Sequence, residues 1–166
     1  MNAQIQVELL TADQWARAKE LRLASLRDSA HAFGGNLETE SAQSETEWRA
    51  KFEKLNYLVA SVDGVDSAIM TVENLVGDFG ATAWVGGCWT DPKFRGRGAL
   101  RAMFEFVDLH AEEKSWQRHG LGVWEDNYPA IAAYEKLGFK AMGDPQLSSR
   151  VANKFYIRMI RDAVIL

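Results

Sequence analysis

The feature that most constrains the fold is a change of hydrophobic period in the second half of the chain. Residues 80–90 alternate like a strand, the loop 91–98 follows, and helical spacing then runs from Gly98 to about Trp116. A strand at 120–124, a turn at Asn127 and a helix at 129–137 repeat this strand, turn and helix pattern. Two such junctions indicate a mixed α/β domain, and both turns favour a nucleotide-bearing ligand.

The N-terminal third predicts one strand and two helices. Residues 5–10 alternate weakly and are expected to form the strand, after which Thr11 or Asp13 caps a helix that ends near residues 31–35. Ser44 and Glu47 have capping-box spacing and predict a second helix over 45–55.

The remaining strands are placed by alternation and by turn residues such as Asp63-Gly64 and Gly77-Asp78. The element order is therefore β-α-α-β-β-β-α-β-α-β-β, in which the first three consecutive strands form an antiparallel meander. The six strands that follow the N-terminal one are expected at residues 57–62, 67–76, 80–90, 120–124, 139–142 and 151–160, and the first three of these make up the meander.

Composition bounds the function. The chain has 166 residues, 47% hydrophobic residues and a net charge of -4, which predicts one domain over 1–166 and disfavours nucleic acid as a partner. No apolar run is long enough for a membrane span, and the N-terminus lacks a basic leader, so we expect no membrane partner and a cytoplasmic location. The single cysteine, Cys88, excludes an intramolecular disulfide. His31, His110 and His119 lack metal-ligand spacing, so no metal is expected.

Two motifs in this order carry a family resemblance. Segment 90–100, TDPKFRGRGAL, resembles motif A of the GCN5-related N-acetyltransferases, whose core is Arg/Gln-x-x-Gly-x-Gly/Ala. Segment 121–139, LGVWEDNYPAIAAYEKLGF, resembles motif B of the same family, with its Asn, Ala, Tyr and Gly-Phe positions. The resemblance implies a central mixed, mostly antiparallel sheet of six to seven strands, splayed between strands 4 and 5 and flanked by about four helices. It also implies acetyl-CoA as co-substrate.

The residues of the first motif suit a pyrophosphate independently of the resemblance. Free N–H groups at a helix N-terminus attract anions, and glycines at 96 and 98 let phosphate oxygens approach the backbone. Arginine side chains beside them add cationic donors. An ordinary helix cap followed by surface arginines is the alternative. A dinucleotide-binding turn is disfavoured because the G-x-G-x-x-G spacing does not occur. The predicted binding residues are Arg95, Gly96, Arg97, Gly98, Ala99, Leu100 and Arg101, of which Leu100 departs from the family's Gly or Ala.

The strand before this loop contains Gly86-Gly87, which predicts a bulge or a close approach of another backbone. The alternative is that the two glycines accommodate tryptophan packing. By the resemblance, the backbone of Trp89 and Thr90 faces the pantetheine arm, and one of their N–H groups polarises the thioester carbonyl.

Motif B implies the catalytic groups. By the resemblance, Asn127, Ala130 and Tyr134 bind the co-substrate, and Asn127 and Tyr134 are also catalytic, with Tyr134 protonating the departing thiolate. A tyrosine at this helical position is also explained as a core aromatic. A carboxylate is expected as general base, with Glu38, Glu40 and Glu73 as candidates, each also explained as a surface charge, and Glu73 preferred.

These motifs predict an acyl-CoA-dependent N-acyltransferase in which a bound amine attacks the thioester directly, since no histidine is placed by sequence to activate Cys88. The acidic segment between the first two helices favours a cationic acceptor, a small amine or a peptide, although solvated helix charge explains it equally well. A homodimer is the default for such an enzyme. The alternatives are a noncatalytic acyl-CoA-binding module and an interaction domain that has lost the ligand.

Overall fold

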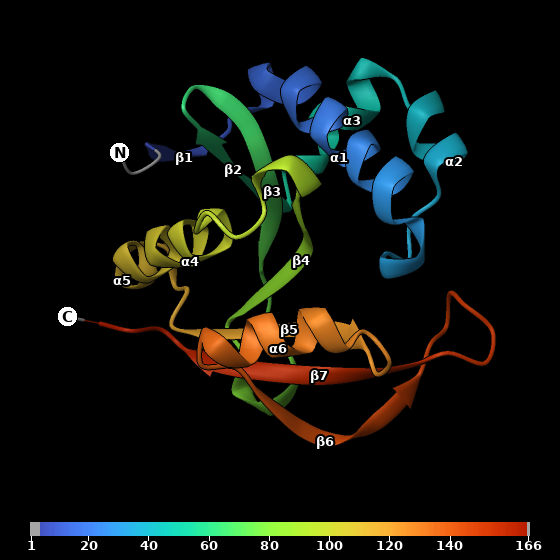
Figure 1. Cartoon of the computed structure of the whole chain (residues 1–166), viewed down its shortest axis with the longest axis vertical. Helices are drawn as coiled ribbons and strands as arrows, with labels where there is room; N and C mark the ends of the chain where they lie inside the picture. The colour runs from blue at the N-terminus through green and yellow to red at the C-terminus, as the bar shows by residue number, and fades with distance from the viewer. Residues whose placement is uncertain (1–3, 166) are drawn as a thin grey trace. The chain divides into compact units, whose positions relative to one another are not determined.

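The computed structural model describes residues 4–165, which form seven strands and six α-helices (Figure 1). The described residues divide into two compact units, the first built from residues 4–73 and 86–106 and the second from 74–85 and 107–165. Neither unit is continuous in sequence, because β4 and α4 each contribute residues to both. A single domain over 1–166 stays a prediction.

The strands form one mixed sheet in the order β1-β2-β3-β4-β5-β7-β6. Pairs β1–β2, β2–β3, β5–β7 and β6–β7 are antiparallel, and β4–β5 is parallel, which confirms the predicted mixed and mostly antiparallel sheet. Among the described residues, the parallel register covers only Ala83↔His119 and Trp84↔Gly120, the limited pairing expected of a splay between strands 4 and 5. The strands are β1 (Ile5–Leu9), β2 (Leu55–Val62), β3 (Val65–Asn74), β4 (Ala83–Thr90), β5 (Arg118–Trp124), β6 (Lys140–Leu147) and β7 (Phe155–Asp162).

The helices number more than the four or so expected. The long helix predicted from Gly98 to Trp116 divides after Leu109 into two, and an unpredicted helix follows Asn36, whose side chain caps it by accepting from Thr39 N. The first difference is a break in the helix and the second is a side-chain cap, and hydrophobic spacing reports neither. The α-helices are α1 (Trp15–Ser29), α2 (Leu37–Ala42), α3 (Glu45–Lys51), α4 (Ala99–Leu109), α5 (Ala111–Lys114) and α6 (Tyr128–Lys136). Within residues 4–165, none of these helices has the length and apolar character needed to span a bilayer.

The core of the first unit lies between α1, α3 and the strands β2 and β3. Trp48 is fully buried in it, and its neighbours include Leu21, Tyr57 and Trp89. The expected cap of α3 is confirmed, because Ser44 Oγ accepts a hydrogen bond from Glu47 N at 3.2 Å. Local helix signals and apolar spacing therefore predicted this layer correctly.

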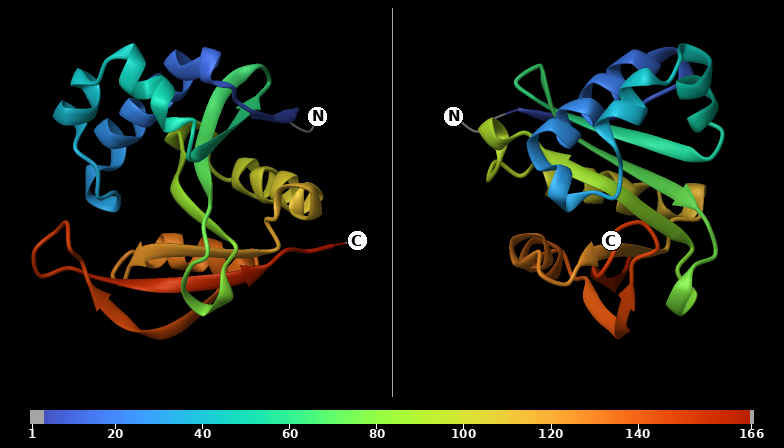
Figure 2. Two further views of the ribbon diagram at one scale, coloured as in Figure 1. Left: turned by 180° about the vertical axis from the view of Figure 1, so that it is seen from behind. Right: turned by 90° about the vertical axis from the view of Figure 1, so that its right-hand side faces the viewer.

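The second unit pairs β5, β7 and β6, and β6 and β7 run side by side in both views of Figure 2. Strand β6 extends to Leu147 and β7 to Asp162, beyond the predicted ends at residues 142 and 160. Edge position explains the length of β6, since an edge strand tolerates the proline at position 145 and the irregular register between Met142 and Gln146.

A buried polar network lies inside the second unit. Arg161 donates to both carboxylate oxygens of Asp108 at 2.7 Å, and Arg161 Nη1 lies 3.1 Å from Nδ1 of the fully buried His119. Because a guanidinium only donates, Nδ1 must accept, so Nε2 carries the proton and donates to Trp116 O at 2.7 Å. His119 is therefore neutral, and burial, the largest cause, together with the Arg161 charge lowers its pKa.

This arrangement predicts a pH dependence of stability. Because the folded-state pKa of His119 lies below the ordinary value of 6.5, the unfolded chain binds the proton more readily, and stability falls as the pH drops below about 6.5. We expect His119→Gln to reduce this slope, by at most about 1.4 kcal/mol per pH unit for one proton. Urea unfolding between pH 7.5 and 5.5 measures it. The exposed His31, changed to Gln, is the control, and an unaltered slope in His119→Gln would contradict the network.

Candidate active site

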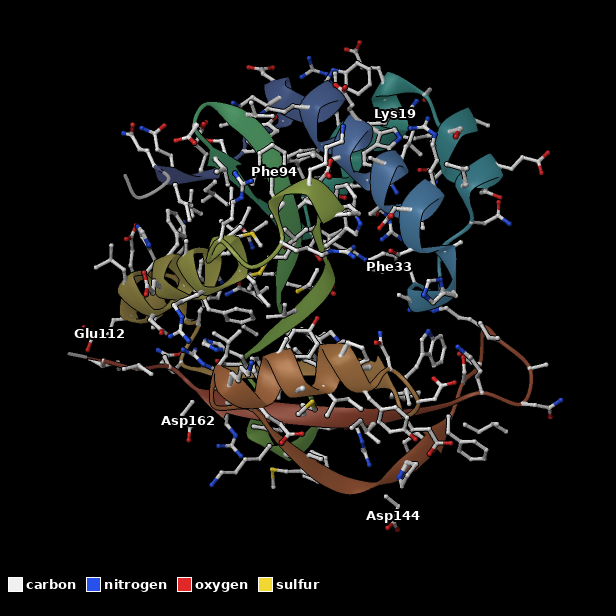
Figure 3. The ribbon with its side chains drawn as sticks, viewed as in Figure 1. Lys19, Phe33, Phe94, Glu112, Asp144 and Asp162 are labelled. Atoms are coloured by element: carbon white, nitrogen blue, oxygen red, sulfur yellow. The ribbon has the colours of Figure 1, made fainter. Side chains whose placement is uncertain are left out.

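The loop between β4 and α4 is built from a sequence of local caps. A short 3-10 turn, Pro92–Phe94, begins after Asp91, whose Oδ1 accepts from Lys93 N at 2.9 Å. Asp91 N in turn donates to Ser67 O at 2.8 Å, which ties the start of the loop to β3. Phe94 is labelled in Figure 3 at this turn, ahead of α4. The loop that follows is therefore anchored at its first residue.

The backbone of residues 95–98 has the form that an anion site needs. Gly96 and Gly98 have φ of +77° and +91°, a left-handed conformation that side chains with a Cβ rarely adopt. Residues 95–98 are exposed, and α4 starts at Ala99, with Ala102 N bonded to Gly98 O at 2.9 Å. The N–H groups ahead of Ala102 have no acceptor one helical turn earlier, so they are available to a ligand. A diphosphate site at these N–H groups stays a prediction.

The three arginines of this loop differ in their surroundings. Arg95 donates from Nε to Thr90 O at 2.9 Å and from Nη2 to Asp28 Oδ2 at 3.0 Å. Arg97 is exposed, with its guanidinium carbon 5.5 Å from the centre of the Phe94 ring, and Arg101 is exposed on the first turn of α4. Arg95 thus has two protein partners, whereas Arg97 and Arg101 are the better placed to meet a phosphate.

The residues at the start of α4 explain how the helix tolerates Leu100. Ala99 is 2% exposed and Leu100 is half-buried, so the first helical turn packs against the protein through both. A half-buried Leu100 leaves the exposed amides of residues 95–98 in place. Its effect on coenzyme affinity stays a prediction.

Strand β4 contains the Gly86-Gly87 pair. Gly87 has φ of +58°, and a Cβ on Gly86 would lie 3.2 Å from Thr71 Oγ1, which itself donates to Gly86 O. The left-handed φ of Gly87 shows a local irregularity, but the atom closest to Gly86 belongs to a side chain and not to another backbone, so the bulge and the backbone approach stay predictions. The side chain of Trp89 is 6% exposed in the core of the first unit, so only its backbone and that of Thr90 remain as candidates for contact with a ligand.

Helix α6 of the second unit carries the other predicted residues. Asn127 caps it, with Oδ1 accepting from Ala130 N at 3.4 Å, and its backbone N donates to Trp124 O at 3.0 Å. Tyr134 is half-buried, and its ring meets the Phe139 ring edge-on with centroids 5.7 Å apart. Asn127 thus has a structural role at the helix end. The catalytic assignments of Asn127 and Tyr134 stay predictions.

The candidate bases occupy three different environments. Glu40 forms a two-point ion pair with Arg22, at 2.9 and 3.1 Å, and Glu38 is exposed on α2. Glu73 is half-buried near the end of β3, opposite Leu55 of β2. The Glu40 carboxylate is engaged by Arg22 through both of its oxygens, so it is the least free of the three to meet an amine. Glu73 stays the preferred candidate.

The first unit contains Glu73, the end of β4 and the loop at 95–101, and the second unit contains Asn127, Ala130 and Tyr134. The loop starts beside Ser67 of β3, whereas Glu73 lies near the other end of that strand. Sequence reasoning missed Asp28 and Arg22, the α1 residues that bind Arg95 and Glu40. Hydrophobic spacing identifies the buried face of a helix, and it carries no information on which polar side chain meets a distant partner.

Known structures with this fold are numerous. The ribosomal-protein-S5-alanine acetyltransferase of Vibrio fischeri is 14% identical with a TM-score of 0.75, covering 96% of this chain and 93% of that one. A putative acetyltransferase from Salmonella typhimurium, determined with its cofactor acetyl-CoA, is 15% identical with a TM-score of 0.72 and covers 96% and 94%. The ribosomal-protein-S18-alanine N-acetyltransferase of Escherichia coli is 17% identical with a TM-score of 0.68 and covers 98% and 96%.

Sequence comparison gives the family. No curated protein sequence matches this chain significantly. A family model for GNAT acetyltransferases, in contrast, matches residues 15–139, which include both motifs, the loop at 95–98 and helix α6. Because this match spans most of the chain and includes every predicted site residue, the chain belongs to the acetyltransferase (GNAT) family.

Proposed function

We propose that this protein transfers an acetyl group from acetyl-CoA to a primary amine. The observation that carries the proposal is the exposed loop at 95–98, where two left-handed glycines precede the N-terminus of α4. Backbone N–H groups in that arrangement bind a diphosphate, and Arg97 and Arg101 add charge beside it. Membership of the GNAT family and the acetyl-CoA complex of the Salmonella typhimurium neighbour support the choice of co-substrate.

The co-substrate supplies an acetyl thioester, which the protein must orient. The protein must also accept a proton from the attacking amine and supply one to the departing thiolate. The N–H groups of Trp89 or Thr90 are proposed to stabilise the carbonyl oxygen as the amine attacks. Tyr134 is proposed to protonate the departing thiolate. An ordinary phenol of pKa about 10 giving its proton to a thiolate of pKa about 8.5 is uphill by about 2 kcal/mol, so hydrogen bonding describes the role as well as transfer does.

A peptide N-terminus is the acceptor that the neighbours favour. Two of them act on alanines of ribosomal proteins S5 and S18. Glu73 is proposed as the base that accepts the amine proton. Direct attack is preferred to a covalent relay because Cys88 lies within β4, where its sulfur is 4.0 Å from the Met70 sulfur, and the sequence places no histidine to activate it. The cytoplasmic location and the homodimer stay proposals.

The test is thiol release from acetyl-CoA with a panel of amines that includes alanine- and serine-starting peptides, a polyamine and an aminoglycoside. We expect acceptor-dependent release with a peptide N-terminus, and CoA binding in a calorimeter without any acceptor. CoA binding with no release for any amine would favour the noncatalytic module. A melting temperature that does not respond to millimolar CoA would point to an interaction domain that has lost the ligand.

A further inference from the structure

Asp28, near the end of α1, gathers three donors on one carboxylate oxygen. Its Oδ2 accepts from Ser29 Oγ at 2.6 Å, from Trp89 Nε1 at 2.9 Å and from Arg95 Nη2 at 3.0 Å. Trp89 belongs to the end of β4 and Arg95 to the loop before α4, so one side chain connects three elements of the first unit. Asp28 lies outside both sequence motifs.

The contacts form a closed path. Arg95, held by Asp28 through Nη2, donates through Nε to Thr90 O at 2.9 Å, and Thr90 follows Trp89 directly. The indole of Trp89 is buried, so its position is set by the core on one side and by Asp28 on the other. The path therefore restrains the Trp89–Thr90 backbone and the first residue of the glycine loop together.

Charge distinguishes Arg95 from its neighbour in the loop. Hydrogen bonds from Ser29 and Trp89, and then the charge of Arg95, lower the pKa of Asp28, so the carboxylate is ionised at neutral pH and compensates Arg95. Among the described residues, Arg97 takes part in none of the ion pairs, and its guanidinium lies over the Phe94 ring. No ion pair among the described residues therefore balances the charge of Arg97.

We propose that Asp28 is a positioning residue for coenzyme binding, acting through Trp89 and Arg95 to hold the end of β4 and the 95–98 loop in the binding conformation. The identity of the ligand rests on the proposed function above. A loop that is already ordered loses less entropy on binding, so the restraint raises affinity without touching the ligand. Arg95 then contributes through loop order, and Arg97 through its charge.

The first experiment uses no ligand. Hydrogen exchange of the hydrogen-bonded backbone amides of Asp91, Lys93 and Phe94 is compared between wild type, Asp28→Ala and Asp28→Asn, with Asp13→Ala as the matched control. Asp13 also pairs with an arginine, Arg49, at 2.8 Å, but on the exposed side of α3. We expect exchange in the loop to rise roughly tenfold in Asp28→Ala, less in Asp28→Asn, and not at all in Asp13→Ala. If the loop amides of both Asp28 variants exchange at the same rate as those of the wild type, the proposal is overturned.

The second experiment is a double-mutant cycle on the dissociation constant for CoA. Asp28→Ala and Arg95→Gln are each expected to weaken binding roughly tenfold, and the double variant by about the same factor, because both remove one restraint. Asp28→Ala with Arg97→Gln is expected to multiply the two effects. The KM of Asp28→Ala for acetyl-CoA should rise, whereas a general loss of folding would lower the amount of active enzyme and leave KM unchanged.

The outcomes separate this proposal from the proposed function. Multiplied losses in the Asp28 and Arg95 double variant would mean that both act independently, which would overturn the positioning role. If wild type binds no CoA, the proposed function fails, and the exchange experiment alone decides whether Asp28 orders the loop. Melting temperatures of all variants identify any that do not fold, in which case Asp28→Asn replaces Asp28→Ala in the cycle.

Discussion

Tyr134→Phe is expected to lower kcat for acetyl transfer by about 10²- to 10³-fold, because it removes the only atom that can protonate the departing thiolate from this position. The phenylalanine ring keeps the edge-on contact with Phe139, whose centroid lies 5.7 Å away, so folding should be preserved. Single-turnover thiol release at saturating acetyl-CoA measures the change, and calorimetric CoA binding checks that affinity is retained.

Tyr128→Phe is the matched control for that measurement. Tyr128 begins the same helix and is 73% exposed, and loss of its hydroxyl should leave kcat unchanged. Equal kcat values for Tyr134→Phe and wild type would show that Tyr134 has no role in the chemical step and only packs as an aromatic side chain on α6. A proportionate loss in Tyr128→Phe would instead indicate that any change to α6 disturbs the site.

Asp108→Ala is expected to destabilise the protein by about 3–5 kcal/mol, because it leaves the Arg161 guanidinium charged, buried and without its carboxylate. Arg161 is 6% exposed, and both of its bonds to Asp108 measure 2.7 Å. The Asp108 carboxylate also accepts from Val164 N at 3.2 Å, so the variant loses a tie to the end of the chain as well. Urea unfolding followed by circular dichroism measures the loss.

An exposed ion pair of the same unit provides the comparison. Asp162 pairs with Arg118 at 2.8 Å, but its side chain is 72% exposed, so Asp162→Ala should cost under about 1 kcal/mol. Asp162 is labelled in Figure 3 at the end of β7. Removing both charges, as Asp108→Leu with Arg161→Met, should cost less than Asp108→Ala, since no isolated charge remains. If Asp108→Ala and Asp162→Ala lowered the free energy of unfolding by similar amounts, burial would not be what makes the Asp108–Arg161 pair important for stability.

The sequence determined those features that depend on neighbouring residues. The glycine loop ahead of α4 was predicted because a left-handed φ at 96 and 98 is a local property of glycine. The cap of α3 at Ser44 and the Asp63-Gly64 hairpin, with φ of 50° and 84°, follow from the same kind of local preference. The burial of Trp48 in the core also fits the apolar spacing of the helix predicted over 45–55.

Strand pairing was only partly accessible from sequence. Alternation located the strands, and the motif resemblance implied their mixed order. The predicted end of β6 was wrong because β6 is an edge strand that continues past Gly143 and Pro145. The predicted end of β7 was wrong because its last residues, Arg161 and Asp162, pair with β5. Helix α2 was missed because it has only six residues, which is too few for a repeat of apolar residues at helical spacing to be recognised.

Only the tertiary structure decided which polar side chains meet. Asp28 binds Arg95 across 67 residues, and Arg161 binds Asp108 across 53. Such pairs leave no periodic trace, because each partner occupies a position that would suit any surface charge. The sequence thus determined the conformation of the loop at 95–98, since backbone preference is local. The fold decided that Asp28 compensates Arg95 and not Arg97, because long-range packing brings only one of these arginines to the end of α1.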